Sequence, residues 1–230
     1  MKPKDYVFCA LDFSDLDETL NFANKIYKDI GGLKVGLELF VKYGIEGVLK
    51  IQKFGIPIFL DLKFNDIPNT VKKSVENVLK IKPDLMTIHL TGGSKMINEV
   101  CKIKGNTKII GVSLLTSLDQ NDLDNFGLKI PQSQFVHNLS VMGVSSGIDG
   151  LVCSPLEVQN LRTKFGNKLI YVTPGIRFNK DNKNDQKRIS SPGSAVLSGS
   201  SLLVIGRPIT ESSNPTKIVK KIIKDISEKI

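Results

Sequence analysis

The segment FLDLKFNDIPNT brings two carboxylates and a lysine close together, because Asp61, Lys63 and Asp66 follow a short apolar run. Asp61 and Lys63 are two residues apart, so on an extended strand both side chains project to the same face. With Lys34 approaching from a neighbouring strand, these groups would form a chain of alternating charges in a partly water-excluded pocket. Such a network keeps a lysine protonated and fixed as a proton donor. The alternative is a structural ion-pair cluster that performs no chemistry.

Two further segments have the composition of a phosphate site. VTPGIR contains Gly175 and Arg177, and VIGRP contains Gly206 and Arg207, so two of the four arginines of the chain lie here. Glycine lets main-chain N–H groups approach phosphate oxygens, and arginine donates paired, charged hydrogen bonds. We therefore expect a phosphorylated small molecule to bind between these segments.

The polar stretch 179–188 separates the two glycine–arginine segments. It predicts a long loop that folds over the phosphate as a lid, with Gln186 and Arg188 as candidate contacts. The alternative is a surface loop without a binding role.

Short apolar runs that position these residues recur through the chain. They are not strictly alternating, which is typical of parallel strands covered on both faces. The eight runs cover residues 6–12, 33–37, 56–62, 85–90, 108–115, 149–154, 168–175 and 201–206.

Amphipathic stretches lie between the runs. The first carries Leu16, Leu20, Ala23, Tyr27 and Ile30 at helical spacing. The last has Asn214 as an expected N-cap before Pro215, followed by apolar residues on one face, which are Ile218, Val219, Ile222, Ile223 and Ile226.

Eight strands alternating with helices over 230 residues predict an α/β fold, a (β/α)8 TIM barrel, as a single domain spanning residues 1–230. A doubly wound sheet is the alternative, but no G-x-G-x-x-G follows the first strand. In a barrel, active sites form where the strands end. The polar residues expected there are Asp12, Lys34, Asp61, Lys63, His89, Thr116, Ser154, Thr173 and Arg207.

Composition excludes several classes of protein. The net charge is +9, but the basic residues are mostly scattered lysines with no run of five, so we expect no nucleic acid as a partner. No window approaches the roughly 18 apolar residues of a membrane span, so we expect a soluble, cytoplasmic protein.

The cysteines and histidines show no metal-ligand or disulfide pattern. Cys9, Cys101 and Cys153 form no C-x-x-C pair and predict reduced thiols. The two histidines, His89 and His137, are far apart and lack metal-ligand spacing, so we expect no His-based metal centre.

The motifs together resemble the orotidine 5'-phosphate decarboxylase family, whose signature is D-x-K-x-x-D-I-P-x-T. The chain matches it from Asp61 to Thr70. The resemblance covers nearly the whole chain in the order of the family. The other matching motifs are ALDF with Asp12, KVG with Lys34, LLTS with Thr116, TPGIR with Arg177, DQKR with Gln186 and IGRPIT with Arg207.

This resemblance implies decarboxylation of orotidine 5'-phosphate to UMP, with no metal and no cofactor. Lys63 would protonate C6 of the pyrimidine and Asp61 would lie beside the departing carboxylate, while Lys34 and Asp12 would hold the ribose. Thr116 would lie near the base, and the phosphate would be bound by Gln186, Arg177, Gly206 and Arg207. Asp66, Ile67 and Thr70 would reach into the site of a second copy, which implies a homodimer with shared sites. His89 is interpreted as a structural hydrogen-bonding residue.

Two other functions stay open. One is the related barrel group that decarboxylates 3-keto-gulonate 6-phosphate or makes hexulose 6-phosphate, which shares D-x-K-x-x-D but requires Mg²⁺. That group has a metal-binding Glu where this chain has Lys34, and a lysine repels a divalent cation. The other is a catalytically silent barrel that binds a nucleotide, against which the intact Asp61, Lys63 and Asp66 argue.

Overall fold

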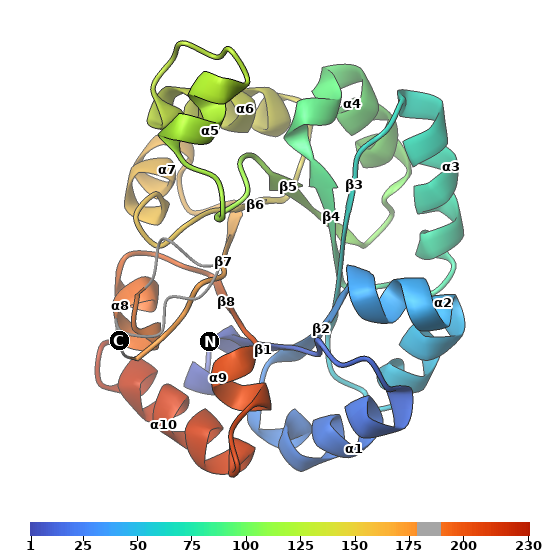
Figure 1. Cartoon of the computed structure of the whole chain (residues 1–230), viewed down its shortest axis with the longest axis vertical. Coiled ribbons are helices and arrows are strands. Elements are labelled where there is room, and N and C mark those ends of the chain that lie inside the picture. The colour runs from blue at the N-terminus through green and yellow to red at the C-terminus, as the bar shows by residue number, and fades with distance from the viewer. Residues whose placement is uncertain (179–189) are drawn as a thin grey trace.

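The computed structural model, which describes residues 1–178 and 190–230, places all eight apolar runs in one closed barrel of parallel strands, in the order β1 to β8. The predicted (β/α)8 fold is therefore confirmed. Six strands are shorter than the runs that predicted them, whereas β2 and β3 keep the predicted length but are shifted along the chain. The strands are β1 Val7–Ala10, β2 Gly32–Gly36, β3 Ile58–Phe64, β4 Leu85–His89, β5 Lys108–Val112, β6 Gly150–Val152, β7 Ile170–Thr173 and β8 Leu202–Ile205. Figure 1 looks down the barrel and shows the helices as a ring around it.

Most connections between strands contain an α-helix. The α-helices of the described residues are α1 Leu16–Ile26, α2 Leu37–Gln52, α3 Pro68–Leu79, α4 Gly93–Ile103, α5 Gln120–Asn125, α6 Gln132–Ser145, α7 Val158–Phe165, α8 Pro192–Leu197, α9 Arg207–Thr210 and α10 Pro215–Ser227. Short 3-10 helices cover Pro3–Tyr6, Tyr27–Asp29 and Leu90–Gly92.

The last helix begins as its sequence predicts. The Asn214 side chain accepts a hydrogen bond from the backbone N–H of Lys217, and Pro215 occupies the first turn, where no backbone donor is needed. Val219, Ile222 and Ile226 are buried. The first helix differs from expectation because it ends at Ile26, so the predicted stripe that ran on to Ile30 leaves the helix. Its buried face is Leu16, Thr19, Phe22, Ala23 and Ile26.

The barrel interior is a small, separate core. Phe8, Phe59, Leu85, Ile110 and Val172 pack together there, away from the larger core between strands and helices. This layer closes the barrel, because side chains and not an open channel fill its centre. Polar residues that follow the strand ends are consequently held above an apolar base.

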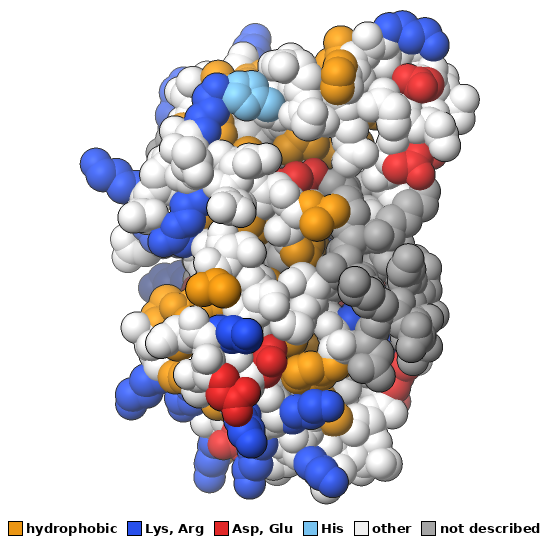
Figure 2. All heavy atoms as spheres, turned by 90° about the vertical axis from the view of Figure 1, so that its left-hand side faces the viewer, with side chains coloured by type: hydrophobic (Ala, Val, Ile, Leu, Met, Phe, Trp, Pro, Cys, Tyr) orange, Lys and Arg blue, Asp and Glu red, His pale blue; other side chains and the backbone are white. Residues whose placement is uncertain are grey.

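The surface carries charges of both signs. On the face drawn in Figure 2, Lys and Arg side chains are spread over the height of the molecule, and acidic side chains lie in both its upper and its lower part. Within residues 1–178 and 190–230, no helix combines the length and the apolar character that a bilayer crossing would need.

Candidate active site

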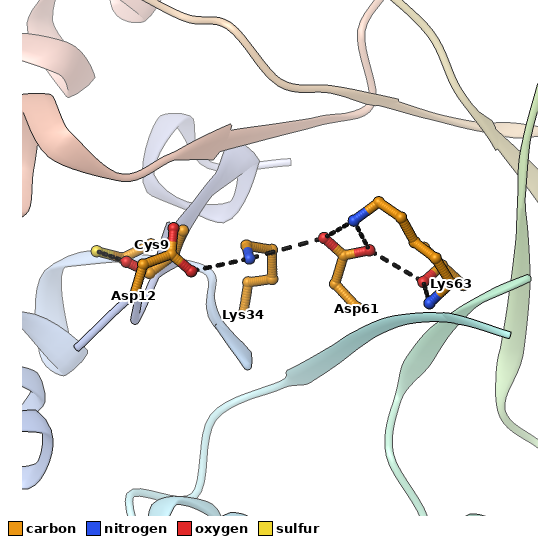
Figure 3. Close-up of polar contacts among 7 residues, drawn as sticks. Cys9, Asp12, Lys34, Asp61 and Lys63 are labelled. Carbon is orange, nitrogen blue, oxygen red and sulfur yellow. Dashed lines mark hydrogen bonds and ion pairs between the residues drawn. The ribbon is translucent and has the colours of Figure 1, made fainter. Parts of the chain in front are cut away.

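Four charged side chains form a continuous chain across the ends of the first three strands. Lys34 Nζ lies 3.2 Å from Asp12 Oδ1 and 3.6 Å from Asp61 Oδ2. Lys63 Nζ lies 2.9 Å from both carboxylate oxygens of Asp61. Figure 3 shows this alternating order, Asp12, Lys34, Asp61 and Lys63, in one line of contacts. The network expected from the sequence is therefore present for these four residues.

The backbone that brings Asp61 and Lys63 together is not a regular strand, which corrects the geometry expected from their spacing. Lys63 has a φ of 51°, in the left-handed region. The pairing of β3 with β4 also shifts between Leu60 and Phe64. The two side chains therefore meet at an irregularity in β3, of the kind that often re-aims side chains at functional sites.

Asp61 is held as a carboxylate by its neighbours. Burial alone would raise its pKa, but Lys34, Lys63 and hydrogen bonds from Lys63 and Thr87 outweigh burial and hold that pKa below its usual range. Lys34 is also buried, with only 7% of its surface exposed. An ionised Asp61 fixes the Lys63 ammonium in the wall of the cavity, which is the arrangement a general acid needs.

A cavity of about 300 Å³ opens beside this charge chain. Its wall includes the sequence-predicted residues Asp12, Lys34, Asp61, Lys63, Thr116, Gly175, Arg177, Gly206 and Arg207. Apolar side chains, among them Phe59, Val172 and Val204, form much of the remainder. Gly175 has a φ of 76°, a conformation that suits glycine. One cavity thus combines a proton-donor network with the two glycine–arginine segments.

The structure separates three predicted residues from this cavity. Asp66, Ile67 and Thr70 are exposed and do not line it. The sequence suggested that Asp61 and Asp66 flank the same lysine; instead, the Asp66 carboxylate accepts a hydrogen bond of 2.6 Å from the Ile67 backbone N–H. Gln186 and Arg188 lie outside the described residues.

Three other polar residues at strand ends also lie outside the cavity wall. Ser154 and Thr173 are fully buried, and the Thr173 hydroxyl hydrogen bonds to Ser200 at 2.7 Å. His89 is half-buried, and its ring has no hydrogen-bond partner within the described part of the chain, so the structural hydrogen bond expected of it is not found. Burial and the Lys63 charge lower the pKa of His89, which favours a neutral ring.

Sequence reasoning missed Thr87. This residue is fully buried in β4, and its hydroxyl donates to Asp61 Oδ1 and accepts from the Lys63 backbone N–H, both at 2.9 Å. The available signal was a single hydroxyl within the apolar run LMTIHL, two residues before His89 at the strand end.

The cysteines take no part in this chemistry. Cys9 and Cys153 are buried, and burial raises the pKa of each thiol far above its usual range. Burial also raises the pKa of Cys101, to about 11. All three are free thiols and would be protonated near neutral pH, so none is an activated nucleophile.

A closed eight-stranded barrel with a charged cavity at the carboxyl ends of its strands defines a TIM-barrel enzyme site for a phosphorylated small molecule. Comparison with known proteins identifies the family. The chain belongs to the orotidine 5'-phosphate decarboxylase / HUMPS family, whose model matches residues 5–222.

Individual relatives agree over nearly the full length. The orotidine 5'-phosphate decarboxylase of Wolbachia pipientis is 42% identical, with 96% of this chain and 99% of that protein covered. The one from Ehrlichia chaffeensis is 43% identical, with 96% and 97% covered. The crystal structure of orotidine 5'-phosphate decarboxylase from Lactobacillus acidophilus has a TM-score of 0.84 at 36% identity, covering 96% and 98%.

Proposed function

We propose that residues 1–230 act as one (β/α)8 domain that decarboxylates orotidine 5'-phosphate to UMP and CO2, the last step of de novo pyrimidine nucleotide synthesis, without a cofactor. One observation carries this proposal: the alternating chain Asp12, Lys34, Asp61 and Lys63 shares a cavity with two glycine–arginine segments. The names of relatives at about 40% identity support the same reaction.

The chemistry requires a fixed positive charge. When the bond between C6 and the carboxylate breaks, CO2 leaves and the electron pair stays on C6, with no conjugated group to delocalise it. The Lys63 ammonium stabilises this developing charge and transfers its proton to C6, forming UMP and a neutral amine that regains a proton from water. Asp61, held ionised between two ammonium groups, orients Lys63 and lies beside the departing carboxylate.

Binding is assigned to the surrounding residues. Gly206 and Arg207 bind the phosphate with Arg177, and Gln186, which lies outside the described residues, is assigned to the phosphate as well. Lys34 and Asp12 hold the ribose hydroxyls, and Thr116 contacts the base. Binding energy from the remote phosphate can position the reacting carbon, which raises kcat and not only affinity.

A second copy of the chain completes each site in this proposal. The exposed positions of Asp66, Ile67 and Thr70 support it, since 68% of the Ile67 surface is accessible in the single chain. An exposed apolar side chain beside polar groups suits an interface. We therefore propose a homodimer in which these three residues enter the partner's cavity.

The Mg²⁺-dependent sugar-phosphate enzymes remain the nearest alternative, because the matching family also includes the HUMPS group. Lys34 disfavours them: its ammonium lies between the Asp12 and Asp61 carboxylates, where a cation would have to bind. Within residues 1–178 and 190–230, no group of three or more His, Cys, Asp or Glu side chains could hold a metal ion.

The three free thiols support a reducing compartment, and we place the enzyme in the cytoplasm.

An ultraviolet assay of orotidine 5'-phosphate consumption, with and without EDTA, tests this function. We expect UMP to form at the same rate in both conditions. A requirement for added Mg²⁺ would favour the sugar-phosphate group. Tight UMP binding without turnover under either condition would indicate a catalytically silent barrel.

A further inference from the structure

The irregularity in β3 has a single residue opposite it. Leu60 pairs with Met86, and the next aligned pair is Phe64 with Ile88. Three residues of β3, Asp61 to Lys63, therefore lie opposite only Thr87 of β4. An irregular pairing of this kind disrupts the ladder locally and leaves backbone groups that need other partners.

The hydroxyl of Thr87 supplies such a partner. It accepts a hydrogen bond from the Lys63 backbone N–H and donates one to Asp61 Oδ1, both at 2.9 Å. A hydroxyl can accept and donate at once, which an aliphatic side chain of the same shape cannot do. One buried group thus contacts both the left-handed backbone of the proton donor and the carboxylate that orients its ammonium.

We propose that Thr87 is a positioning residue for the decarboxylation. Its hydroxyl holds the Lys63 backbone and the Asp61 carboxylate in fixed positions relative to each other. This inference rests on the proposed function, in which Lys63 delivers a proton to C6. Thr87 does not line the cavity and acts only through the two residues that do.

The hydrogen bonds indicate what the hydroxyl prevents. Asp61 Oδ1 receives both Thr87 and Lys63 Nζ, and Asp61 Oδ2 receives Lys63 Nζ and lies 3.6 Å from Lys34 Nζ. Without Thr87, the carboxylate can rotate about its last torsion, which is broad for aspartate. The Lys63 amide would also lose its partner, so the left-handed turn would be less well fixed. Both changes displace the ammonium without altering the phosphate-binding segments.

The experiment compares Thr87→Val, which keeps the shape but removes the hydroxyl, with Thr87→Ser, which keeps the hydroxyl. Thr107→Val is the matched control, because Thr107 is also buried, but its hydroxyl donates to the Pro83 carbonyl at 2.7 Å and the residue does not line the cavity. The measurements on the full chain are kcat and KM for orotidine 5'-phosphate, the Kd of UMP, and hydrogen exchange of the Lys63 amide by NMR.

We expect Thr87→Val to lower kcat by about tenfold to a hundredfold, because a small misplacement of a reacting group has effects of that order. KM and the UMP Kd should change by less than about twofold, and Lys63 amide exchange should accelerate about tenfold or more. Thr87→Ser and Thr107→Val should resemble the parent in all measurements. If Thr87→Val does not fold, Thr87→Ala removes the same hydroxyl.

Several results would overturn the inference. Parental kcat in Thr87→Val with an active parent would do so while leaving the decarboxylase function intact. Loss of activity in Thr87→Ser equal to that in the valine variant would also exclude a role for the hydroxyl. An inactive parent would refute the proposed function. In that case accelerated exchange of the Lys63 amide in Thr87→Val would still support the positioning of the Lys63 backbone by Thr87, and unchanged exchange would refute it.

Discussion

The two ends of this barrel use aspartates differently. At the amino-terminal end, Asp84 Oδ2 accepts from the Ile58 backbone N–H at 2.8 Å, and Asp149 Oδ2 accepts from that of Ile109 at 2.9 Å. Each carboxylate accepts from a backbone N–H in the first two residues of a neighbouring strand. At the carboxyl-terminal end, Asp61 instead accepts from an ammonium and a hydroxyl and borders a cavity. One end closes the sheet, while the other holds charge where a ligand can reach it.

Strand pairing is regular between β4 and β5 but irregular between β3 and β4, where the charged residues lie. β4 and β5 align without interruption from Leu85 with Lys108 to His89 with Val112. β3 loses its register with β4 at the residues that carry the charges. Regular strand pairing thus closes the barrel. The shifted pairing between β3 and β4 sets the direction of the Lys63 side chain. This division predicts that changes at the two ends affect different measurements.

The largest effect is expected at Lys63. Lys63→Ala should lower kcat by about four orders of magnitude, because the proton donor and its stabilising charge are both lost. The folded variant should still bind UMP, whose phosphate and ribose contact other residues. Kinetic assays and calorimetric titration with UMP measure the two effects. Lys72→Ala, which removes a lysine paired with Glu99 on the helix surface, is the control and should leave both unchanged.

The Lys63→Ala variant also tests whether two copies of the chain share each active site. Asp66→Ala should also be severely impaired, through loss of a group given to the second copy. Mixing it with Lys63→Ala under exchange conditions should form heterodimers in which one site has both residues intact, and activity should return to at most about half per heterodimer. Stable heterodimers, identified by mass spectrometry, that are no more active than either parent would place Asp66 in the same chain's site as Lys63.

An intermediate effect is expected at the phosphate segment. Arg207→Ala should weaken binding of substrate and UMP together by about 2–4 kcal/mol, since a charged hydrogen-bond partner of the phosphate is removed. Arg162→Ala is a suitable control, because Arg162 donates to the Gly199 carbonyl and Asn167 and does not border the cavity. Parental UMP affinity in Arg207→Ala would remove this residue from the phosphate site. Arg188→Ala should have only a small effect.

The fold could be predicted from the sequence because buried parallel strands leave a strong signal. Runs such as IPIFLDL and LMTIHL are apolar on both faces, and each became a strand of the barrel. Their ends were less predictable: the run 108–115 contains a strand that ends at Val112. Apolar residues that continue past the last ladder pair pack in the loop, and periodicity does not distinguish the two.

The site was predictable by residue type but not by backbone shape. Asp61 and Lys63 do meet, yet through a left-handed residue and a shifted register that no spacing rule indicates. Thr87 was missed because a lone threonine in an apolar strand is compatible with ordinary burial. We placed Asp66 near Lys63 because the two residues are close in sequence. In the single chain, however, the Asp66 carboxylate accepts a hydrogen bond from the Ile67 backbone N–H. Whether it enters a second site depends on another copy, which one sequence cannot position.

The smallest effect on activity, and a clear effect on stability, is expected at the amino-terminal end of the barrel. Asp149 joins three strands there: its backbone N–H donates to Ile109, its carbonyl accepts from Ile170, and its carboxylate accepts from Ile109. Lys104 Nζ lies 2.6 Å from the same carboxylate.

Asp149→Ala should therefore lower the free energy of unfolding by about 2–3 kcal/mol, because the backbone amide of the buried Ile109 and the Lys104 ammonium both lose a charged partner. Asp149→Asn should lose less, since its carbonyl oxygen can still accept from Ile109. Denaturant unfolding measures both changes. At temperatures well below the unfolding transition, kcat and KM should equal those of the parent, because the substitution lies at the opposite end of the barrel from the charge chain. A reduced kcat in folded Asp149→Ala would show that the two ends are coupled through the interior core of Phe8, Phe59 and Leu85, and the division of roles between them would then be wrong.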